Sequence, residues 1–453
     1  MHMFSTLDKN KKICLIGIGG ISMSALALAL AHQGFRVYGS DRNAGETTAM
    51  LSRKGIEVVI GHRAETVEGA GCVIVTAAVH ADNPELRRAR ELGIPVLRRS
   101  EAWGELMRAC REVICICGCH GKSTTTALCT HIALEAGLDP SVMIGAQLPV
   151  IGGTVRCGGT GLFVAEACEY CDSFLDFPPT VAVVNNIEAD HLDYFKDLEA
   201  IKTSFGRFIA KVPASGAVVA NCDDANTVDV VRGCGKRVIW FGLREGDVHA
   251  EKLHDEQGFF SFDLVTPAGS RRVKLRIPGE YNVYNALASA AAFHALGVAL
   301  DAAVDGIEAF GGIARRFERV GSFHGAPVID DYAHHPTALR DVLAAVKEMG
   351  YQRIFCVFQP HTYSRTAQLY NDFLEALKAA DVAVIADIYA AREENLYGVS
   401  AEMMAEALEN GVYAGDFSGI CTYLENHVQQ GDVVLTVGAG DIYKVGRKLN
   451  GKA

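Results

Sequence analysis

The chain has 453 residues, which is too long for one hydrophobic core, so about two to four domains are expected and three are predicted. Its 43 Lys and Arg stand against 54 Asp and Glu, and the net charge of -11 argues against a protein that holds nucleic acid by neutralising phosphates broadly. No stretch approaches the roughly 18 uninterrupted apolar residues of a membrane span, and the N-terminus lacks a secretory signal, so a cytoplasmic protein without a membrane anchor is expected.

The 14 cysteines are expected to be reduced thiols that fill apolar positions, because the chain is long and carries no export signal. Cys115, Cys117 and Cys119 alternate in the sequence, as residues on one face of a strand do. Cys168 and Cys171 form the only CxxC pair, and without a second pair at finger-like spacing they do not predict a zinc site or a redox motif.

Residues 12 to 110 alternate short apolar runs with helical stretches, which predicts a mostly parallel sheet covered by helices. A glycine-rich turn, GIGGISMS from Gly17 to Ser24, leads from the first strand into a helix, and Asp41 ends the next strand. Such glycines let the backbone approach a diphosphate at the helix N-terminus, and the acid can accept a ribose hydroxyl. Because Ser22 replaces the third glycine of the dinucleotide fingerprint, another nucleotide diphosphate is preferred over NAD, with a purely structural turn as the remaining alternative.

A second unit is predicted between boundaries near 110 and 318, and it opens with a strand, the loop GCHGKST and a helix. The loop amides and Lys122 can cradle phosphates, while the Ser123 hydroxyl can reach Mg²⁺. Two residues rather than four separate the loop glycines, so the sequence predicts a shortened phosphate-binding loop. Residues 250 to 277 predict an antiparallel hairpin, which is followed by an Ala-rich buried helix.

Two acidic segments follow strands of this second unit, EACEYCDSF from Glu166 to Phe174 and NNIEADHLDYF from Asn185 to Phe195. Carboxylates and a histidine just beyond two strands are suited to hold hard cations near a phosphate, since Mg²⁺ prefers oxygen ligands and tolerates an imidazole. Acidic surface loops are common, but beside a phosphate-binding loop these segments predict a magnesium site.

The remaining residues form a third predicted α/β unit with the segments ARRFERV, DDYAHHPT and QPHTYSRT. Arg315, Arg316 and Arg365 are candidates to clamp carboxylate or phosphate oxygens bidentately. Each of these segments adjoins an apolar strand, and the ends of such strands are where α/β sheets bind ligands, which favours a site over isolated surface salt bridges. The adjacent histidines His334 and His335, followed by a proline, are hard to explain as packing.

In combination these motifs resemble the Mur ligases, and the resemblance covers nearly the whole chain. It rests on the segments GIGGISMS, GCHGKSTTT, NNIEADHLDY, GEYNVYNALAS, RRFE, DDYAHHPT and QPHTYSRT, which stand in the family's order. The resemblance implies an α/β protein of three domains: a Rossmann-like domain for a UDP moiety over residues 1–110, a central P-loop ATPase-type mononucleotide-binding domain over 111–318, and a Rossmann-like domain for an amino acid over 319–453.

Carried over by position, the resemblance implies three sets of site residues. The residues expected to bind the UDP-sugar are Gly17, Gly19, Gly20, Ser22 and Met23 at the diphosphate, with Asp41 and Thr76 nearby. The residues expected to bind ATP are Gly118, His120, Gly121, Lys122, Ser123, Thr124, Asn282, Asn285, Arg316, Asp331 and His335. The residues expected to act in catalysis are Lys122, His191, His334 and Arg365.

Within these sets the resemblance implies finer roles. Lys122 would hold the β and γ phosphates. Ser123 and Glu169 would bind one Mg²⁺, and His191 would bind a second that bridges the γ-phosphate and the substrate carboxylate. The family often reads EADESDASF where this chain has EACEYCDSF, so the choice of Glu169 over Glu166 is a preference. Thr362 stands where many members carry a basic residue, which leaves the selection of the amino acid open.

Further roles follow from the same resemblance. Asn282 and Asn285 would lie against the base of ATP and Arg316 near its phosphates, with Asp331 and His335 at the ribose and adenine side. His334 and Arg365 would face the incoming amino acid.

The resemblance and the motifs together predict an ATP-dependent, Mg²⁺-dependent ligase of peptidoglycan precursor synthesis that acts through an acyl phosphate. Its expected substrates are UDP-N-acetylmuramate and L-alanine, and it is expected to be a monomer or a weak homodimer. The alternatives are a ligase that attaches a preformed tripeptide to the same nucleotide sugar, a dehydrogenase and a non-catalytic nucleotide-binding regulator. GIGGISMS and QPHTYSRT favour the ligase that adds L-alanine over the tripeptide ligase.

Overall fold

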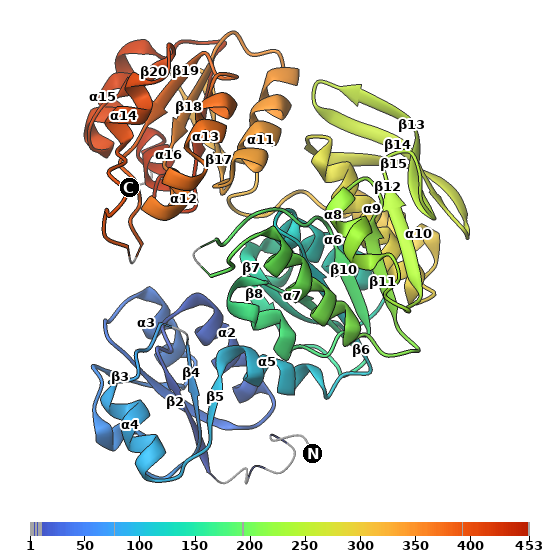
Figure 1. Cartoon of the computed structure of the whole chain (residues 1–453), viewed down its shortest axis with the longest axis vertical. Coiled ribbons are helices and arrows are strands. Elements are labelled where there is room, and N and C mark those ends of the chain that lie inside the picture. Colours follow the sequence, from blue (N-terminus) through green and yellow to red (C-terminus); the bar gives the residue numbers. More distant parts are fainter. Residues whose placement is uncertain are drawn as a thin grey trace.

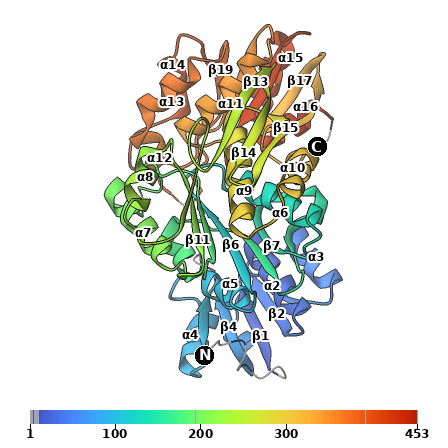
Figure 2. The ribbon, with the colours of Figure 1, turned by 90° about the vertical axis from the view of Figure 1, so that its right-hand side faces the viewer.

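The computed structural model describes Phe4, Leu7 and residues 11–76, 78–192, 194–391 and 393–451, and Asp193 of the second acidic segment lies outside these ranges. The described residues form three β-sheets with helices packed against them, one sheet in each of three domains (Figure 1). Figure 2 shows the three domains following one another along the long axis, with the central domain between the other two. The predicted three-domain α/β fold is confirmed.

The N-terminal domain contains a five-stranded parallel sheet of order β3-β2-β1-β4-β5, which matches the parallel sheet expected from its alternating pattern. Its strands are β1 (Lys12–Ile16), β2 (Arg36–Asp41), β3 (Glu57–Ile60), β4 (Ala70–Val75) and β5 (Val96–Arg98). Its helices are α2 (Ile21–His32), α3 (Glu46–Arg53), α4 (Pro84–Glu91) and α5 (Arg99–Met107). The glycine-rich turn therefore lies between β1 and α2, at the carboxyl end of the sheet, where nucleotide ligands bind in such folds.

The central domain contains a ten-stranded sheet of order β15-β14-β13-β12-β11-β10-β6-β9-β7-β8. Its strands are β6 (Glu112–Cys117), β7 (Ser141–Leu148), β8 (Gly153–Arg156), β9 (Leu162–Glu166), β10 (Val181–Val184), β11 (Ala217–Asn221), β12 (Val238–Gly242), β13 (Val248–Glu256), β14 (Phe259–Thr266) and β15 (Gly269–Pro278). Its helices are α6 (Lys122–Glu135), α7 (Leu198–Ala210), α8 (Ala225–Val231), α9 (Tyr281–Ala295) and α10 (Leu300–Ala309). The expected hairpin is the antiparallel pair β14 and β15, and the expected Ala-rich buried helix is α9.

Strand β6 lies in the middle of this sheet and is buried on both faces, as its nearly continuous apolar sequence predicts. Cys115 and Cys117 face one hydrophobic cluster, while Ile114 and Ile116 face the other. The alternation of cysteines is therefore a packing pattern on one face of a strand. Each of the 14 cysteines is a free thiol, as expected.

The C-terminal domain contains a six-stranded sheet of order β16-β17-β21-β18-β19-β20, parallel except for the antiparallel edge strand β16. Its strands are β16 (Glu318–Phe323), β17 (Ala326–Asp331), β18 (Ile354–Phe358), β19 (Val382–Ile385), β20 (Gly411–Tyr413) and β21 (Val433–Val437). Its helices are α11 (Pro336–Glu348), α12 (Tyr363–Gln368), α13 (Tyr370–Leu377), α14 (Ala401–Glu406), α15 (Phe417–His427) and α16 (Tyr443–Leu449). The domain boundaries at 110/111 and 318/319 stay predictions.

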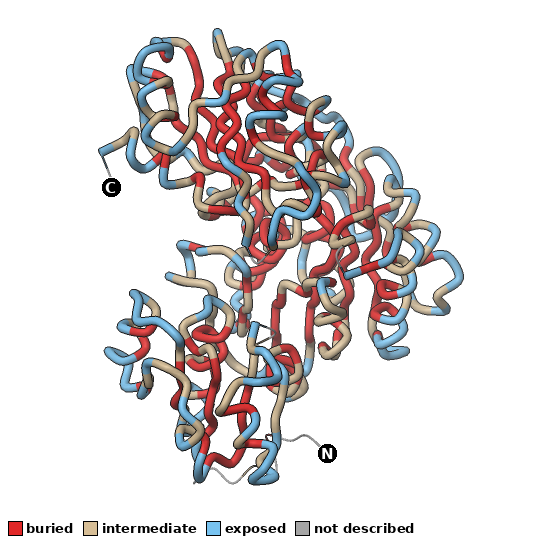
Figure 3. The backbone as a smooth tube through the Cα atoms, turned by 60° about the vertical axis from the view of Figure 1, so that its left-hand side comes forward, coloured by how far each residue is buried: buried red, intermediate tan, exposed pale blue. Residues whose placement is uncertain are grey.

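The N-terminal and central domains share a hydrophobic core, whereas the C-terminal domain has cores of its own. Figure 3 shows the buried backbone concentrated in the interior of each domain. One apolar cluster runs from the N-terminal domain into the central domain, where Trp103 of α5 meets Phe163 of β9 edge to face at 6.2 Å. The clusters of the C-terminal domain consist of residues from 317 onward. The segment that leads into this domain has positive φ at Gly312, Arg315 and Phe317. Within the described ranges, no helix has the length and apolar composition needed to cross a membrane.

Candidate active site

The predicted phosphate-binding loop lies between β6 and α6, at the carboxyl end of the central sheet. Gly118 and Gly121 both have positive φ, at 135° and 78°. A Cβ atom on Gly121 would lie 2.4 Å from Oδ1 of Asn285, so this position has no room for a side chain. The amide of His120 donates to Oδ1 of Asn186 at 2.8 Å. The loop is therefore held in one shape by the polar groups behind it, and its helix presents free amides to an anion.

Lys122 is held between the loop and a buried carboxylate. Its Nζ donates to the carbonyl oxygen of Gly118 at 2.5 Å and lies 3.1 Å from both carboxylate oxygens of Glu169, whose side chain is 1% exposed. Burial alone would lower the pKa of Lys122, but the charge of Glu169 outweighs it and raises the pKa above its usual value. Lys122 is therefore a permanent cation at the mouth of the loop.

Glu169 and Glu166 lie on either side of this loop with different partners. Nε2 of His191 lies 3.6 Å from Glu169, and Sγ of Cys168 belongs to the same cluster of potential metal ligands. Glu166 accepts hydrogen bonds from the Ser123 hydroxyl at 2.9 Å and from the amide of Gly145 at 2.8 Å. The structure thus places Glu169 beside His191, and it places the Ser123 hydroxyl against Glu166 and not against Glu169, with which it was predicted to bind one Mg²⁺; the metal assignments stay predictions.

A first cavity of about 600 Å³ opens in front of the phosphate-binding loop, between the central and C-terminal domains. The predicted ATP residues that line it are His120, Gly121, Lys122, Thr124, Asn282, Asn285, Arg316, Asp331 and His335. Asn285 of α9 accepts from the Thr125 hydroxyl of α6 at 3.0 Å and donates to Asn282 of α9 at 2.9 Å. It therefore links α9 to the helix that follows the phosphate-binding loop. Gly118 and the buried Ser123 stand behind this lining.

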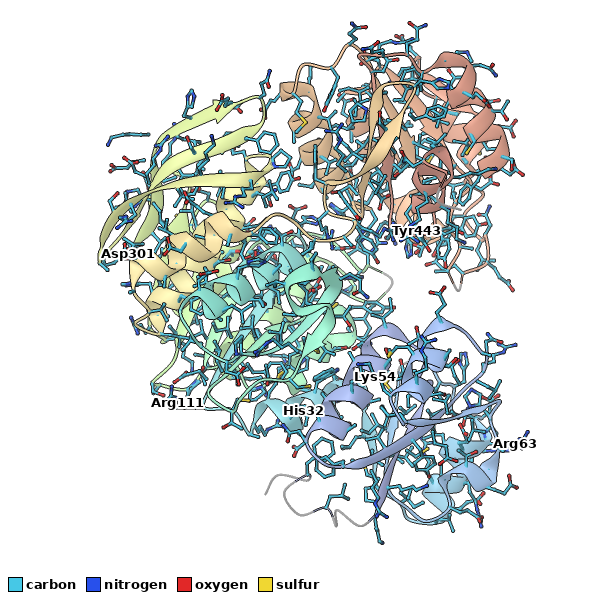
Figure 4. All side chains as sticks on the ribbon, turned by 180° about the vertical axis from the view of Figure 1, so that it is seen from behind. His32, Lys54, Arg63, Arg111, Asp301 and Tyr443 are labelled. Atoms are coloured by element: carbon cyan, nitrogen blue, oxygen red, sulfur yellow. The ribbon has the colours of Figure 1, made fainter. Side chains whose placement is uncertain are left out.

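The C-terminal domain closes the cavity with strand-end residues. Arg316 reaches Oγ of Ser123 at 3.4 Å and lies over the ring of Tyr332 at 4.9 Å. The neighbouring Arg315 stacks on Tyr332 and on Tyr443, which Figure 4 places on the C-terminal domain. Both carboxylate oxygens of Asp331 accept backbone amides, so this residue fixes the shape of its own loop as well as lining the cavity.

The two histidines that follow β17 are neutral. Nδ1 of His334 bonds the carbonyl oxygen of Tyr332 at 3.0 Å and must therefore carry the proton, which leaves Nε2 as an acceptor. Burial, reinforced by Arg365, holds the pKa of His334 well below its usual value. Burial likewise lowers the pKa of His335 to about 4, and within the described part of the chain its Nε2 has no hydrogen-bond partner.

Two acids of the central domain bind the C-terminal domain directly. Asp190 accepts from Arg365 at 2.9 Å, and Glu188 accepts from the Thr337 hydroxyl at 2.9 Å. His191 and Arg365 hold the pKa of Asp190 well below its usual value although burial opposes this. Despite burial, hydrogen bonding and charge from His120 lower the pKa of Glu188 to about 2. Ionised carboxylates therefore join the two domains beside the phosphate-binding loop.

A second cavity of about 370 Å³ lies between α2 and α5 of the N-terminal domain and the central domain. Ser22 lines it, together with Arg99, Trp103, Glu166 and Cys168. The first-turn amides of α2 lack intrahelical partners, so this helix end can accept the charge of a diphosphate.

The remaining predicted UDP residues form the turn itself. Gly17 has φ of 81°, and a Cβ atom on it would meet Thr76 at 2.9 Å. Asp41 accepts from the amide of Gly19 at 2.8 Å, so it holds the turn, and its contact with a ribose stays a prediction. The Met23 side chain is 2% exposed and packs in the core shared with the central domain. The side chain therefore does not reach a ligand at the turn, its backbone amide remains available there, and the contact of Met23 with the diphosphate stays a prediction.

A third cavity of about 380 Å³ lies between the central and C-terminal domains on the other side of His191. Arg365 lines it, while His334 lines the first cavity, and the role of both toward an amino acid stays a prediction. Thr362 lines it too, with positive φ of 68° and a hydroxyl that accepts from the amide of Arg365 at the start of α12.

The first cavity, which the phosphate-binding loop lines, shares residues with each of the other two. Glu166 and Cys168 line both the first and the second, and Asp190 and His191 line both the first and the third. Groups bound in the second and third cavities would therefore approach a group bound in the first near Cys168 and His191. This arrangement allows a carboxylate, a terminal phosphate and an amine to react in sequence at one place.

The sequence analysis did not name several residues that line the cavities as site residues. Asp190 and Glu188 stand in the quoted acidic segment, but their partners lie far away in the sequence. His361 stands in QPHTYSRT, and burial lowers its pKa to about 4; its Nδ1 is buried and unpartnered among the described residues. Glu393, which accepts from the Ser364 amide at 2.8 Å, has no sequence signal because it belongs to a loop.

The buried neutral histidines predict an acid-sensitive fold. The pKa of His335 is about 4 in the folded protein, whereas its usual value is 6.5. Between pH 6.5 and pH 4 this side chain is therefore protonated in the unfolded chain but neutral in the folded one, so acid favours unfolding. We expect the free energy of unfolding, measured by urea denaturation, to fall by about 3 kcal/mol for this residue as pH drops from 6.5 to 4.

The His335→Gln variant should show a shallower fall over this range. His254→Gln serves as the control, because His254 is exposed on β13, the strand next to the β14–β15 hairpin. An unchanged pH dependence in His335→Gln would contradict the assignment.

Comparison with known proteins matches each domain to a family model. The matching models are "Mur ligase family, catalytic domain" over residues 12–111, "Mur ligase middle domain" over 116–293 and "Mur ligase, glutamate ligase domain" over 315–440. The UDP-N-acetylmuramate--L-alanine ligase of Acetivibrio thermocellus is 45% identical over 456 residues, covering 98% of this chain and 97% of that protein.

Solved structures agree with these matches. The UDP-N-acetylmuramate-alanine ligase of Thermotoga maritima superposes with a TM-score of 0.81 at 29% identity, over 98% of this chain and 99% of that one. The UDP-N-acetylmuramate:L-alanyl-gamma-D-glutamyl-meso-diaminopimelate ligase of Neisseria meningitides gives a TM-score of 0.62 at 30% identity, over 67% of this chain and 99% of that one.

The fold and the site define a three-domain α/β protein of the ATP-dependent ligase class, in which a nucleotide site meets two further cavities. The chain belongs to the Mur ligase family.

Proposed function

We propose that this chain joins L-alanine to the lactyl carboxylate of UDP-N-acetylmuramate at the expense of ATP, in the synthesis of peptidoglycan precursors. The observation that carries the proposal is the sharing of lining residues among three cavities: the first, which Lys122 lines, shares Glu166 and Cys168 with the second, and Asp190 and His191 with the third. The first cavity suits ATP, the second the nucleotide sugar and the third the amino acid. Identity of 45% over nearly the whole chain to a UDP-N-acetylmuramate--L-alanine ligase supports this choice.

The reaction proceeds in two steps. An oxygen of the lactyl carboxylate attacks the γ-phosphorus, the bond to the ADP oxygen breaks, and an acyl phosphate and ADP result. The alanine amine then attacks the acyl carbon and loses a proton, and the acyl–oxygen bond breaks to release phosphate and leave an amide. Lys122 neutralises charge that develops on the phosphoryl oxygens in the first step, and Arg316 stands across the same cavity.

Magnesium is part of the proposal, and the residues present fit it. Glu169 offers a buried carboxylate and His191 an imidazole 3.6 Å away, and the Ser123 hydroxyl begins the neighbouring helix. Carboxylate, hydroxyl and phosphate oxygens are the ligands that Mg²⁺ prefers, and it tolerates an imidazole. The bound cation would supply charge neutralisation at the phosphate oxygens.

The C-terminal domain protects the mixed anhydride from water. Arg365 and Thr337 of that domain contact Asp190 and Glu188 of the central domain, which seals the junction between the first and third cavities. Excluding water favours attack by the amine over hydrolysis of the acyl phosphate. Arg365 and the neutral His334 are proposed to receive the amino acid there. The proposal includes a monomer or weak homodimer in the cytoplasm, with neither nucleic acid nor membrane as a partner.

Phosphate release with defined acceptors tests the function. With ATP, Mg²⁺ and UDP-N-acetylmuramate present, we expect L-alanine to stimulate phosphate release more than glycine, L-serine or the tripeptide does. Each acceptor is compared at the same concentration, and the mass of the nucleotide-sugar product is checked. Faster release with the tripeptide would replace the proposal by the recycling ligase, and ATP turnover independent of every acceptor would reject both.

A further inference from the structure

Cys168 occupies an unusual place in the candidate active site. It lines both the first and the second cavity, so it stands where the terminal phosphate of one ligand would meet the carboxylate of the other. Its sulfur, a carboxylate oxygen of Glu169 and a ring nitrogen of His191 all lie within 4.8 Å of one another.

Glu169 and His191 can serve magnesium, but with the sulfur of Cys168 added the three groups make a set that suits zinc better. Zinc binds thiolate, imidazole and carboxylate in tetrahedral sites, and sites with three protein ligands keep a fourth position open. Zinc bond lengths place neighbouring tetrahedral ligand atoms roughly 3.5 Å apart, and the contact of His191 with Glu169 measures 3.6 Å. Magnesium prefers oxygen ligands, so a sulfur ligand adds little to its affinity. Zinc binds sites of mixed nitrogen, oxygen and sulfur ligands more tightly than the other common divalent ions do, except copper.

The site is charged and sheltered in a way that suits a cation. Glu169 is 1% exposed, and the cation that now faces it is Lys122, 3.1 Å from both its oxygens. Lys122 can move toward a phosphate or the cavity when a metal ion takes its place at this carboxylate. The ring of Tyr170 packs against His191 with centroids 4.7 Å apart, which holds the imidazole beside the cluster.

We propose that Cys168, Glu169 and His191 form a zinc-binding site, and that Zn²⁺ bound there excludes productive Mg²⁺ and ATP and so inhibits the enzyme. On binding, the thiol of Cys168 gives its proton to solvent and its sulfur bonds the metal; no electron transfer is involved. Burial raises the pKa of this thiol to about 12, so the metal must displace the proton. The inhibitory part of the proposal rests on the ligase function above, while metal binding does not.

Cobalt titration of the full-length protein without nucleotide tests the binding directly, because Co²⁺ takes zinc sites and a thiolate ligand adds a near-ultraviolet charge-transfer band. We expect wild type to develop this band and to lose it when Zn²⁺ is added. Cys168→Ser should lack the band and bind Zn²⁺ at least about tenfold more weakly, since even partners behind metal ligands cost tenfold or more. Cys168→Asp should also lack the band.

Cys171→Ser is the matched control, because it removes a thiol from the same loop but outside the cluster. It should keep the band. A band that is absent from wild type, persists in Cys168→Ser or disappears in Cys171→Ser would overturn the site.

Inhibition is measured in the phosphate-release assay with Mg²⁺ in excess. Zn²⁺ at concentrations that saturate the cobalt-displacement signal should inhibit wild type, and Cys171→Ser should be inhibited equally. If Zn²⁺ binds without lowering the rate of phosphate release, the metal site is supported but its proposed effect on catalysis is rejected. An inactive wild type with an intact cobalt band would instead count against the ligase function and leave the zinc site in place.

Discussion

Replacing Lys122 with alanine is expected to lower the turnover number by at least about a thousandfold. The ammonium group lies at the loop, next to the position that the terminal phosphate would occupy, and its charge is permanent because Glu169 stabilises it. Loss of a charge that opposes the developing phosphoryl charge costs several kcal/mol of barrier, about 4 kcal/mol for this factor. Phosphate release with ATP, UDP-N-acetylmuramate and L-alanine measures it.

Lys378→Ala is the control for this variant, because Lys378 is an exposed lysine at the C-terminal end of α13, paired with Glu375 and outside the three cavities. It should retain wild-type turnover. Circular dichroism should show that Lys122→Ala is folded, since the change leaves the buried Glu169 without its ammonium partner. Activity of Lys122→Ala within about tenfold of wild type would reject the role of this residue.

Replacing Glu169 with glutamine is expected to lower turnover by at least about a hundredfold and to raise the concentration of Mg²⁺ required. The buried carboxylate faces Lys122 and His191, and the neutral amide removes the charge that would hold the cation. Such a loss corresponds to about 3 kcal/mol of barrier. Turnover is followed by phosphate release as Mg²⁺ is titrated.

Glu166→Gln is the matched comparison, because the two acids stand three residues apart in one loop. Glu166 accepts from Ser123 and from the amide of Gly145 through one oxygen, and a glutamine oxygen can keep both bonds. We therefore expect a smaller effect, about tenfold or less. If Glu166→Gln is the more damaged variant, Glu166 rather than Glu169 holds the metal.

The architecture could be predicted because it follows from local patterns. Short apolar runs separated by helical stretches indicate parallel sheets, and strand β6 with its loop and helix stands where the sequence predicts it. The β14–β15 hairpin was also predictable, since its strands alternate around a tight turn. The order of strands in the ten-stranded sheet was not, because β6 pairs with strands distant in the sequence.

The site could be predicted in its chemistry but less in its connections. The loop glycines and Lys122 predict phosphate binding, since a phosphate needs a closely approaching backbone and a positive charge, and one short segment supplies both. Asp190 and Arg365 are 175 positions apart, and their ion pair depends on how two domains dock. Met23 stands in a motif, yet its side chain packs in the core because one helix must serve both the turn and the interior.

The unequal joining of the domains has a consequence for the order of product release. Separating the N-terminal and central domains would expose the apolar surface that they share, at a free-energy cost of about 25 cal/mol for each Å² exposed. The C-terminal domain meets the central one through ion pairs and hydrogen bonds that water can replace, and the linking segment around Gly312 and Arg315 can act as its hinge. We therefore expect the enzyme to open between the central and C-terminal domains. We expect ADP and phosphate to depart as the hinge swings, while the UDP-linked product stays longest on the two domains that do not separate.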